Sequence, residues 1–153
     1  MENSYQKTFQ ADWSDMDYNS HMRNTAYLEK SADMRMMFFS DHDFPMKEFV
    51  QSKIGPVIMK DKIEYFREVN LMDELEAYLV IAGLSRDGSR WQMRNEFFSS
   101  DGKLTAKVSS VGGWLDLSAR KLVAAPPKLL AALERRPKTK DFQFLDAITR
   151  EGK

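Results

Sequence analysis

The residues best suited to chemistry lie together near the start of the chain. Residues 14–24 contain two carboxylates, two carboxamides and one of the two histidines of the sequence, namely Asp15, Asp17, Asn19, Asn24 and His21. An alternating apolar and polar pattern precedes this stretch, and a helical pattern follows it. A carboxylate at such a junction faces the free N–H groups and the positive dipole end of the helix. This arrangement can hold an anionic base or nucleophile beside donors that polarise a carbonyl.

Other chemistries have little support in the sequence. The chain has no cysteine, which excludes disulfides, thiolate zinc sites and cysteine nucleophiles. It also has no Gly-x-Ser-x-Gly elbow and no glycine-rich phosphate loop. His42 between Asp41 and Asp43 suggests a metal site shared with His21, but this histidine spacing matches no recognised ligand pattern. We therefore predict no metal and no cofactor.

The composition is that of one ordinary domain. Its 153 residues include 23 basic and 23 acidic ones, so the net charge is zero. This balance argues against a nucleic-acid partner or an anionic membrane surface. No apolar run approaches the roughly 20 residues that cross a bilayer, and residues 1–7 lack the apolar core of a secretory signal. We expect a cytoplasmic protein with no membrane partner.

The pattern along the chain begins with a strand and a long helix. Residues 5–13 alternate as a strand does, and apolar residues recur at helical spacing from Asn24 to Phe38. The segment 41–45 ends this helix, and a shorter helix is expected over 46–52, starting after Pro45. Small residues on the long helix would let it approach a sheet closely.

Four more strands follow, joined mainly by tight turns. They are predicted over 57–65, 75–81, 91–97 and 104–117, with hairpin turns at 86–89 and 99–102. Gly112 and Gly113 indicate a bulge or a close backbone approach. A short helix is expected from Pro126 to about Arg135. We assign residues 1–135 to a single domain and 136–153 to a polar C-terminal tail, in which Phe142, Phe144 and Leu145 could dock.

This order of elements predicts an α+β architecture. One helix cannot cover both faces of a five-stranded antiparallel sheet, but a strongly curved sheet can wrap around it. We therefore expect the long helix on the concave side of the sheet.

At this point the chain resembles hot-dog-fold acyl-CoA thioesterases of the 4-hydroxybenzoyl-CoA thioesterase-like family. That family opens with an aromatic residue, Asp-x-Asp-x-x-Gly-His-x-x-Asn and a Tyr-Leu helix. The matching positions are Trp13, Asp15, Asp17, His21, Asn24, Tyr27, Leu28 and Arg35. Weaker matches follow in order at 63–65, 73–75, 101–102 with Ala106, and 120–121 before Pro126, so the similarity covers about residues 7–130. The family's glycines before the histidine and before the third-strand aspartate are replaced by Ser20 and Met72.

The resemblance implies an activity and a set of roles. Asp17 would be the catalytic carboxylate, and a backbone N–H at Asn24 or a neighbour would bind the thioester carbonyl. Members of the family form homodimers with active sites at the interface, and pairs of dimers are common. CoA is held near strand ends by basic and hydroxyl groups, for which Arg86, Ser89 and Arg90 are the loose equivalents. Tyr27, Met34 and Trp91 are candidates to contact the acyl group.

Several residues have a structural alternative that the sequence leaves open. Asp17 could simply shape a turn before the helix, whereas Asp15 is better explained as a structural partner in that turn. Asn19 is expected in a left-handed turn conformation. His21 could equally orient Asp17 or be a satisfied histidine at the helix start.

Asn24 and Glu29 also have more than one interpretation. Asn24 fits an N-cap better than a substrate contact. Glu29 is most simply a solvated residue, although some other hot-dog thioesterases draw a catalytic glutamate from this helix.

The resulting prediction is hydrolysis of an acyl-CoA thioester, or less readily of an acyl-carrier-protein thioester, to a free acid. The carboxylate would act as nucleophile or as general base. One alternative is a non-catalytic module that binds acyl thioesters. A second is a hot-dog dehydratase or hydratase, which normally pairs a histidine with a carboxylate on a differently placed helix.

Overall fold

The elements appear in the predicted order. The computed structural model describes residues 5–148. The first half of the chain forms β1 (Tyr5–Gln10), the short 3-10 helix η1 (Trp13–Asp15), α1 (Asn24–Asp41), α2 (Met46–Ser52) and β2 (Ile54–Tyr65). The second half forms β3 (Glu74–Ser85), β4 (Arg90–Ser99), β5 (Leu104–Asp116), β6 (Lys121–Val123), α3 (Pro127–Glu134) and β7 (Lys138–Leu145).

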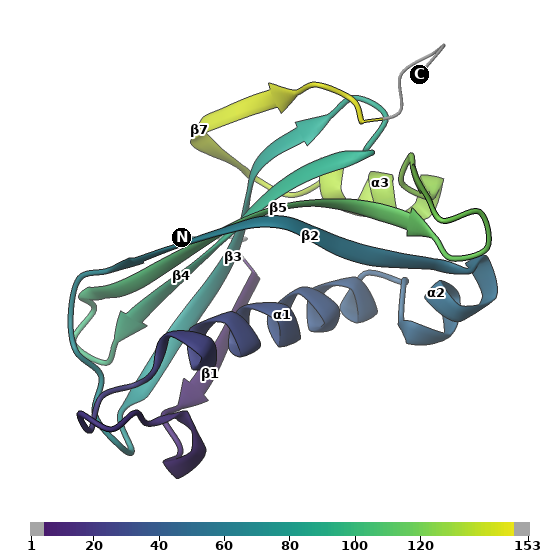
Figure 1. The fold of residues 1–153 in the computed structure, drawn as a ribbon. Coiled ribbons are helices and arrows are strands. Elements are labelled where there is room, and N and C mark those ends of the chain that lie inside the picture. Colours follow the sequence, from purple (N-terminus) through teal and green to yellow (C-terminus); the bar gives the residue numbers. More distant parts are fainter. Residues whose placement is uncertain (1–4, 149–153) are drawn as a thin grey trace.

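A curved sheet wraps around α1, which confirms the predicted α+β architecture (Figure 1). Its main path has the order β1-β3-β4-β5-β2, and all these neighbours pair antiparallel. The prediction of five strands is incomplete, because β6 pairs with β5 and β7 pairs with β3. The short β6 follows a turn after β5, and its three residues give too little alternation to be recognised in the sequence.

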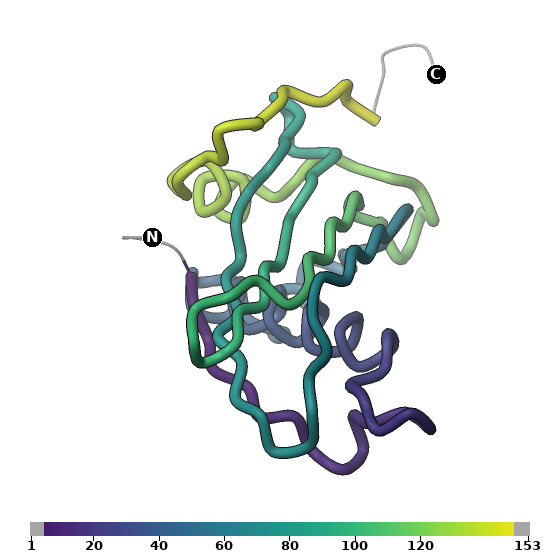
Figure 2. The backbone as a smooth tube through the Cα atoms, turned by 90° about the vertical axis from the view of Figure 1, so that its left-hand side faces the viewer, coloured from purple at the N-terminus to yellow at the C-terminus, as the bar shows by residue number. Residues whose placement is uncertain are grey.

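The strand β7 corrects the prediction of a polar C-terminal tail. Residues 138–145 pair parallel with the second half of β3, and β1 pairs with the first half of the same strand. Since β4 occupies the other side of β3, both β1 and β7 lie along one edge of it (Figure 2). The segment resembles a solvated tail because its charged residues are exposed and its other positions are at most half-buried.

Close packing at Gly112 helps the sheet to curve. A Cβ atom there would lie 2.3 Å from the carbonyl oxygen of Val57 and 2.4 Å from the Trp91 ring. The facing strand β2 has an irregularity between Ile58 and Lys60, so one residue is extra at this place. The predicted close approach at the paired glycines is therefore confirmed, and only glycine fits position 112.

The core lies between α1 and the concave face of the sheet. Large side chains of both elements are almost fully buried, and they include Tyr27, Met34, Phe38, Phe39, Trp91, Met93, Phe97 and Trp114. Edge-to-face ring pairs join the layers, with centroids 5.2 Å apart for Tyr27–Phe97 and 5.6 Å apart for Phe39–Trp114. Burial of one such side chain contributes about 1.5–3 kcal/mol, so this layer fixes α1, and therefore its N-terminus, relative to the sheet.

One cation is also buried in this layer. The guanidinium of Arg35 donates a hydrogen bond of 3.2 Å to Ser110 Oγ, and that hydroxyl donates to Asp61 on β2 at 2.6 Å. Burial lowers the pKa of Arg35, and the nearby Asp61 partly offsets that shift.

Within the described residues, no helix is long and apolar enough to cross a membrane.

Candidate active site

The loop between η1 and α1 forms a tight turn that holds Asp17. Met16 and Met22 form an isolated antiparallel bridge, and the Asp17 N–H donates to the His21 carbonyl at 2.7 Å. One carboxylate oxygen of Asp17, Oδ1, accepts the backbone N–H groups of Asn19 at 2.8 Å and His21 at 3.0 Å. An aspartate commonly stabilises a turn in this way, so its orientation is fixed by the backbone.

Two residues in this region adopt the backbone conformation that favours glycine. Ser20 has φ 64° and Met72 has φ 74°, and these are the positions at which the resembled family has glycine. The left-handed residue of the turn is therefore Ser20, whereas the sequence suggested Asn19. Met72 lies beside the same region, because its N–H donates to the carbonyl of Ala11 at 2.8 Å. The chain keeps the turn geometry although it lacks both glycines.

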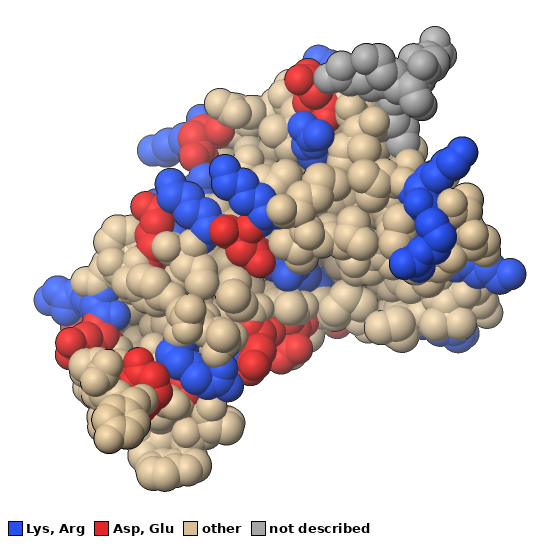
Figure 3. Space-filling model, viewed as in Figure 1, with Lys and Arg blue, Asp and Glu red and all other residues tan. Residues whose placement is uncertain are grey.

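The side chain of Asp17 lines a cleft of about 250 Å³ together with Trp13, Met16, Ser20 and Leu71. Its second carboxylate oxygen, Oδ2, has no hydrogen-bond donor among residues 5–148. The indole of Trp13 is 81% exposed, so the cleft is open on that side. Mostly uncharged side chains form this end of the molecule, bordered by charged ones (Figure 3). One carboxylate oxygen of Asp17 is thus fixed by hydrogen bonds, and the other accepts none from the described residues.

The helix α1 begins beside this loop with unpaired amides. Its N-cap is Arg23, which makes no capping hydrogen bond with its side chain, so the expectation of Asn24 as the N-cap is wrong by one position. The N–H groups of a first helical turn have no intrahelical acceptor. Those of Asn24 and Thr25 consequently remain available to an incoming oxygen, and the sequence predicted donors at this place.

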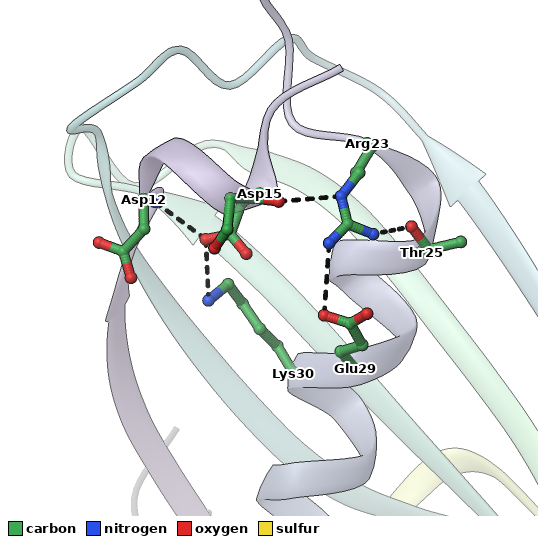
Figure 4. A network of polar contacts seen from close by, with 7 residues as sticks. Asp12, Asp15, Arg23, Thr25, Glu29 and Lys30 are labelled. Carbon is green, nitrogen blue, oxygen red and sulfur yellow. Dashed lines mark hydrogen bonds and ion pairs between the residues drawn. The ribbon is translucent and has the colours of Figure 1, made fainter.

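Ion pairs around η1 and α1 fix the approach to the helix (Figure 4). Asp15 is only 6% exposed, and it accepts the Asp12 N–H at 2.9 Å and pairs with Lys30 at 3.2 Å. Arg23 donates to the Ser14 carbonyl at 3.0 Å, contacts the Thr25 hydroxyl and lies 3.5 Å from Glu29. Asp15 is therefore structural, as predicted, and Glu29 belongs to the same network.

His21 and Tyr27 line a second cleft of about 300 Å³ on the other side of the loop. The His21 ring does not point at Asp17: its Nε2 lies 3.1 Å from a carboxylate oxygen of Glu68. Tyr27 is almost fully buried and packs edge-to-face against Tyr65 at 5.8 Å. Burial raises the pKa of Tyr27 to about 12, so its phenol stays neutral at physiological pH.

The segment 66–69, which follows β2, was missed by sequence reasoning. It lines both the cleft of His21 and a larger one of about 640 Å³ that reaches the hairpin at 99–101. The backbone N–H groups of Phe66 and Arg67 donate to the Thr105 carbonyl at 2.8 and 3.1 Å, which holds the segment against β5. Its sequence signal is weak, since an aromatic residue followed by charges also describes an ordinary strand end.

The predicted CoA-binding residues lie at the opposite end of the sheet. Asp17 is near the start of β3, where the Ala11 N–H bonds the Asp73 carbonyl, whereas Arg86 follows the end of that strand. A 12-residue strand spans on the order of 35 Å. Ser89 is fully buried, and its hydroxyl donates to Asp87 and accepts the Ile148 N–H, both at 2.8 Å. One chain therefore does not bring Arg86, Ser89 and Arg90 to Asp17.

The remaining candidate, a metal site, has no counterpart in the described part of the chain. Residues 5–148 contain no group of three or more histidine or carboxylate side chains arranged to hold an ion. The His42 Nδ1 instead lies 2.7 Å from the Phe38 carbonyl at the end of α1.

Known structures with the same fold confirm the architecture. SAV2348 of Staphylococcus aureus, solved in complex with CoA, matches with a TM-score of 0.81 and 18% identity over 90% of this chain and 88% of its own. The 1,4-dihydroxy-2-naphthoyl-CoA thioesterase Slr0204 of Synechocystis matches at 0.77 and 15%, over 86% and 96%. YbaW, a probable thioesterase of Escherichia coli, matches at 0.74 and 21%, over 86% and 98%. None of the curated proteins compared with the chain matches it.

The curved sheet around one helix and the carboxylate turn before that helix define a hot-dog protein. A family model described as the thioesterase-like superfamily matches residues 11–133. The chain therefore belongs to the thioesterase-like superfamily, as the resemblance of its opening motif predicted. Residues 138–145, which form β7, lie outside the matched region.

Proposed function

We propose that this protein hydrolyses an acyl-CoA thioester to a free acid and CoA, with Asp17 as the reacting carboxylate. The observation that carries the proposal is the asymmetry of this side chain. Its Oδ1 is held by two backbone N–H groups while its Oδ2 has no hydrogen-bond donor among the described residues, and Asp17 lines a cleft in the loop that precedes α1. Membership of the thioesterase-like superfamily supports the reaction class, and the CoA bound to SAV2348 supports the type of substrate.

Two chemical routes are compatible with this geometry. In the first, Oδ2 attacks the thioester carbonyl, the CoA thiolate leaves, and water hydrolyses the resulting anhydride. In the second, the carboxylate takes a proton from a water molecule, which attacks the carbonyl while the thiolate leaves and is later protonated. In both, the first-turn amides of α1 near Asn24 would stabilise the oxyanion, and one such donor contributes roughly 3 kcal/mol.

The acyl group is proposed to lie toward the cleft of His21 and Tyr27. Three aromatic side chains line this cleft, with Tyr65 and Phe66 beside Tyr27. The Glu68 carboxylate fixes the His21 ring, and the His21 backbone N–H holds Asp17. His21 would thus be a positioning residue, because its ring contacts Glu68 in the cleft wall and its backbone N–H holds the Asp17 carboxylate.

We also propose that two copies of the chain form a homodimer, with a further pairing of dimers left open. β2 lies at the end of the strand order, so within residues 5–148 of one chain one edge of this 12-residue strand is unpaired. Ile58 and Met59 on it are 40% and 44% exposed. A long unpaired edge that carries exposed apolar side chains is a template for pairing with another chain. In such a dimer, Arg90 would contact the CoA of a thioester bound at the partner's Asp17.

The decisive experiment compares Asp17→Asn with Asp33→Asn on a panel of acyl-CoAs, with a thiol reagent to detect released CoA. The asparagine oxygen at position 17 can still accept both turn N–H groups, so the loop should keep its shape. It cannot act as an anionic nucleophile or base, and turnover should fall about a hundredfold or more. Asp33 is exposed on α1 and lies outside both clefts, so its variant should hydrolyse normally.

The same panel separates hydrolysis from the alternative of a non-catalytic binding module. Acyl-CoA binding by calorimetry without thiol release from the wild-type protein would refute the hydrolase proposal. Normal turnover in folded Asp17→Asn would instead remove Asp17 from its proposed role.

A further inference from the structure

A separate pocket lies at the far end of the sheet, where β7 meets β3 and α3. It has a volume of about 270 Å³, which is about nine times the volume of one water molecule in the liquid. Its walls are mainly apolar and come from Ile81, Leu84, Leu133, Phe142 and Phe144. Ile81, Leu84 and Leu133 are nearly fully buried, whereas the Phe144 ring is 60% exposed at the opening.

The segment that completes this pocket lies outside the region that the superfamily model matches. The match ends at residue 133, and β7 starts at Lys138. The strand fits closely against β3, because a Cβ atom at Gly83 would lie 3.1 Å from the Leu145 side chain and 3.2 Å from the Gln143 carbonyl. The pocket therefore lies between the matched region and the strand that follows it.

A salt bridge also anchors the segment that precedes the aromatic residues. Asp141 lies 2.7 Å from the Arg94 guanidinium on β4. Arg94 lowers the pKa of Asp141 to about 2. This ion pair joins β7 to β4.

Positive charge stands at the opening of this pocket. The Arg86 guanidinium lies 4.3 Å from the centroid of the Phe144 ring, and the Lys138 ammonium lies 5.3 Å from that of Phe142. Glu134 is the one acidic side chain in the lining, so the charged groups leave one net positive charge. Apolar walls with a few placed polar groups are typical of small-molecule sites. The apolar walls and the net positive charge together favour an anion that carries an apolar chain.

We propose that this pocket binds a small carboxylic acid, with the carboxylate at Arg86 and Lys138 and the apolar chain between Leu133 and the two phenylalanines. A guanidinium recognises a carboxylate through charge-assisted hydrogen bonds. The pocket is too small for a whole CoA molecule, and it lies on the order of 35 Å along β3 from the Asp17 cleft. A free acid is also the product of the reaction proposed above, so a role in sensing product rests on that proposed function.

The test measures binding of octanoate to the full chain by calorimetry, with no thioester present, so its outcome does not depend on hydrolysis. Octylammonium has the same chain and the opposite charge, and it should bind at least tenfold more weakly. Octanoate should also raise the unfolding temperature, since a ligand that binds only the folded state stabilises it.

Three variants locate the site. Arg86→Gln combined with Lys138→Gln should weaken octanoate binding at least tenfold, and Phe144→Ala should weaken it several-fold. Lys140→Gln changes an exposed lysine of the same strand that does not line the pocket, and it should bind octanoate as the wild-type chain does. All replaced side chains are exposed or at the opening, and circular dichroism would verify that each variant is folded.

Four results would overturn the proposal. They are no octanoate binding at millimolar concentration, equal binding of octylammonium, an equal loss of binding in Lys140→Gln, and competition by adenosine 3′,5′-bisphosphate. The last result would assign Arg86 to the nucleotide of CoA instead of to a free acid.

Discussion

Two turns of this molecule are built with the same chemistry, yet they differ in what they leave open. In the hairpin between β3 and β4, Asp87 Oδ1 accepts the N–H of Ser89 at 3.0 Å and the hydroxyls of Ser85 and Ser89 at 2.8 Å. In the loop before α1, Asp17 Oδ1 accepts two N–H groups in a similar way. Ser85 and Ser89 are buried, whereas Asp17 faces a cleft.

The difference shows how a structural turn and a candidate reactive turn can be told apart. An aspartate oxygen that accepts one backbone N–H and two buried hydroxyls is fully used in stabilising its turn. An aspartate held by backbone N–H groups at one oxygen, with the other facing a cleft, keeps its geometry and remains accessible. The residue types alone do not distinguish the two cases, because both turns combine aspartate with serine.

The left-handed position of the hairpin between β3 and β4 gives the largest expected effect on stability. Gly88 has φ 73°, and a Cβ atom there would lie 2.7 Å from Ala125 Cβ and 2.9 Å from Leu130 Cδ1. Gly88→Ala should therefore lower the free energy of unfolding by about 3 kcal/mol, from backbone strain and overpacking together. Urea denaturation would measure it, with Gly102→Ala as the control. Gly102 has φ 80° but no atom within 4 Å of its Cβ position, so a loss as large at Gly102 would contradict the packing argument.

Removal of the structural carboxylate should have a smaller effect. Asp87→Ala leaves the buried hydroxyls of Ser85 and Ser89 without their shared acceptor, which should lower the free energy of unfolding by about 1–3 kcal/mol. Turnover per folded molecule at saturating acyl-CoA should stay normal, because Asp87 is none of the groups proposed to react with the thioester. Paired measurements of unfolding and of initial rates would test this, and a selective loss of turnover would show that the hairpin contributes to the reaction.

The smallest effect is expected at Ser20. Ser20→Gly removes the strain of a left-handed residue but adds conformational freedom to the unfolded chain. The two terms oppose each other, so the free energy of unfolding should rise by no more than about 1 kcal/mol. Thermal unfolding of Ser20→Gly beside Ser20→Ala, which keeps the strain, would measure the difference. A clear destabilisation by glycine would mean that the serine side chain stabilises the turn.

The sequence was sufficient for the main architecture and for the location of the Asp17 loop. Alternation and hairpin turns placed β2 to β5, and the clustered polar residues placed the loop before α1. These signals are local, because side-chain periodicity and turn residues depend on near neighbours. The paired glycines at 112 and 113 also gave a correct prediction of close packing.

What the sequence did not give depends on contacts between distant segments. The pairing of β7 with β3 joins residues such as Gly83 and Gln143, and its charged sequence looked like a solvated tail. The contact of His21 with Glu68 links the loop to a segment that carried no motif. The separation of Arg86 and Ser89 from Asp17 follows from the direction of β3, which spacing along the chain does not reveal.

The shared edge of β3 has a consequence for synthesis on the ribosome. The second half of β3 is translated more than fifty residues before its partner β7. This corresponds to a delay of roughly 3–10 s at typical elongation rates. During that time its backbone groups from Ile81 to Ser85 lack their final neighbour, and an open edge invites pairing with other nascent chains. Residues 138–145 therefore protect this edge of β3 only after they have been synthesised.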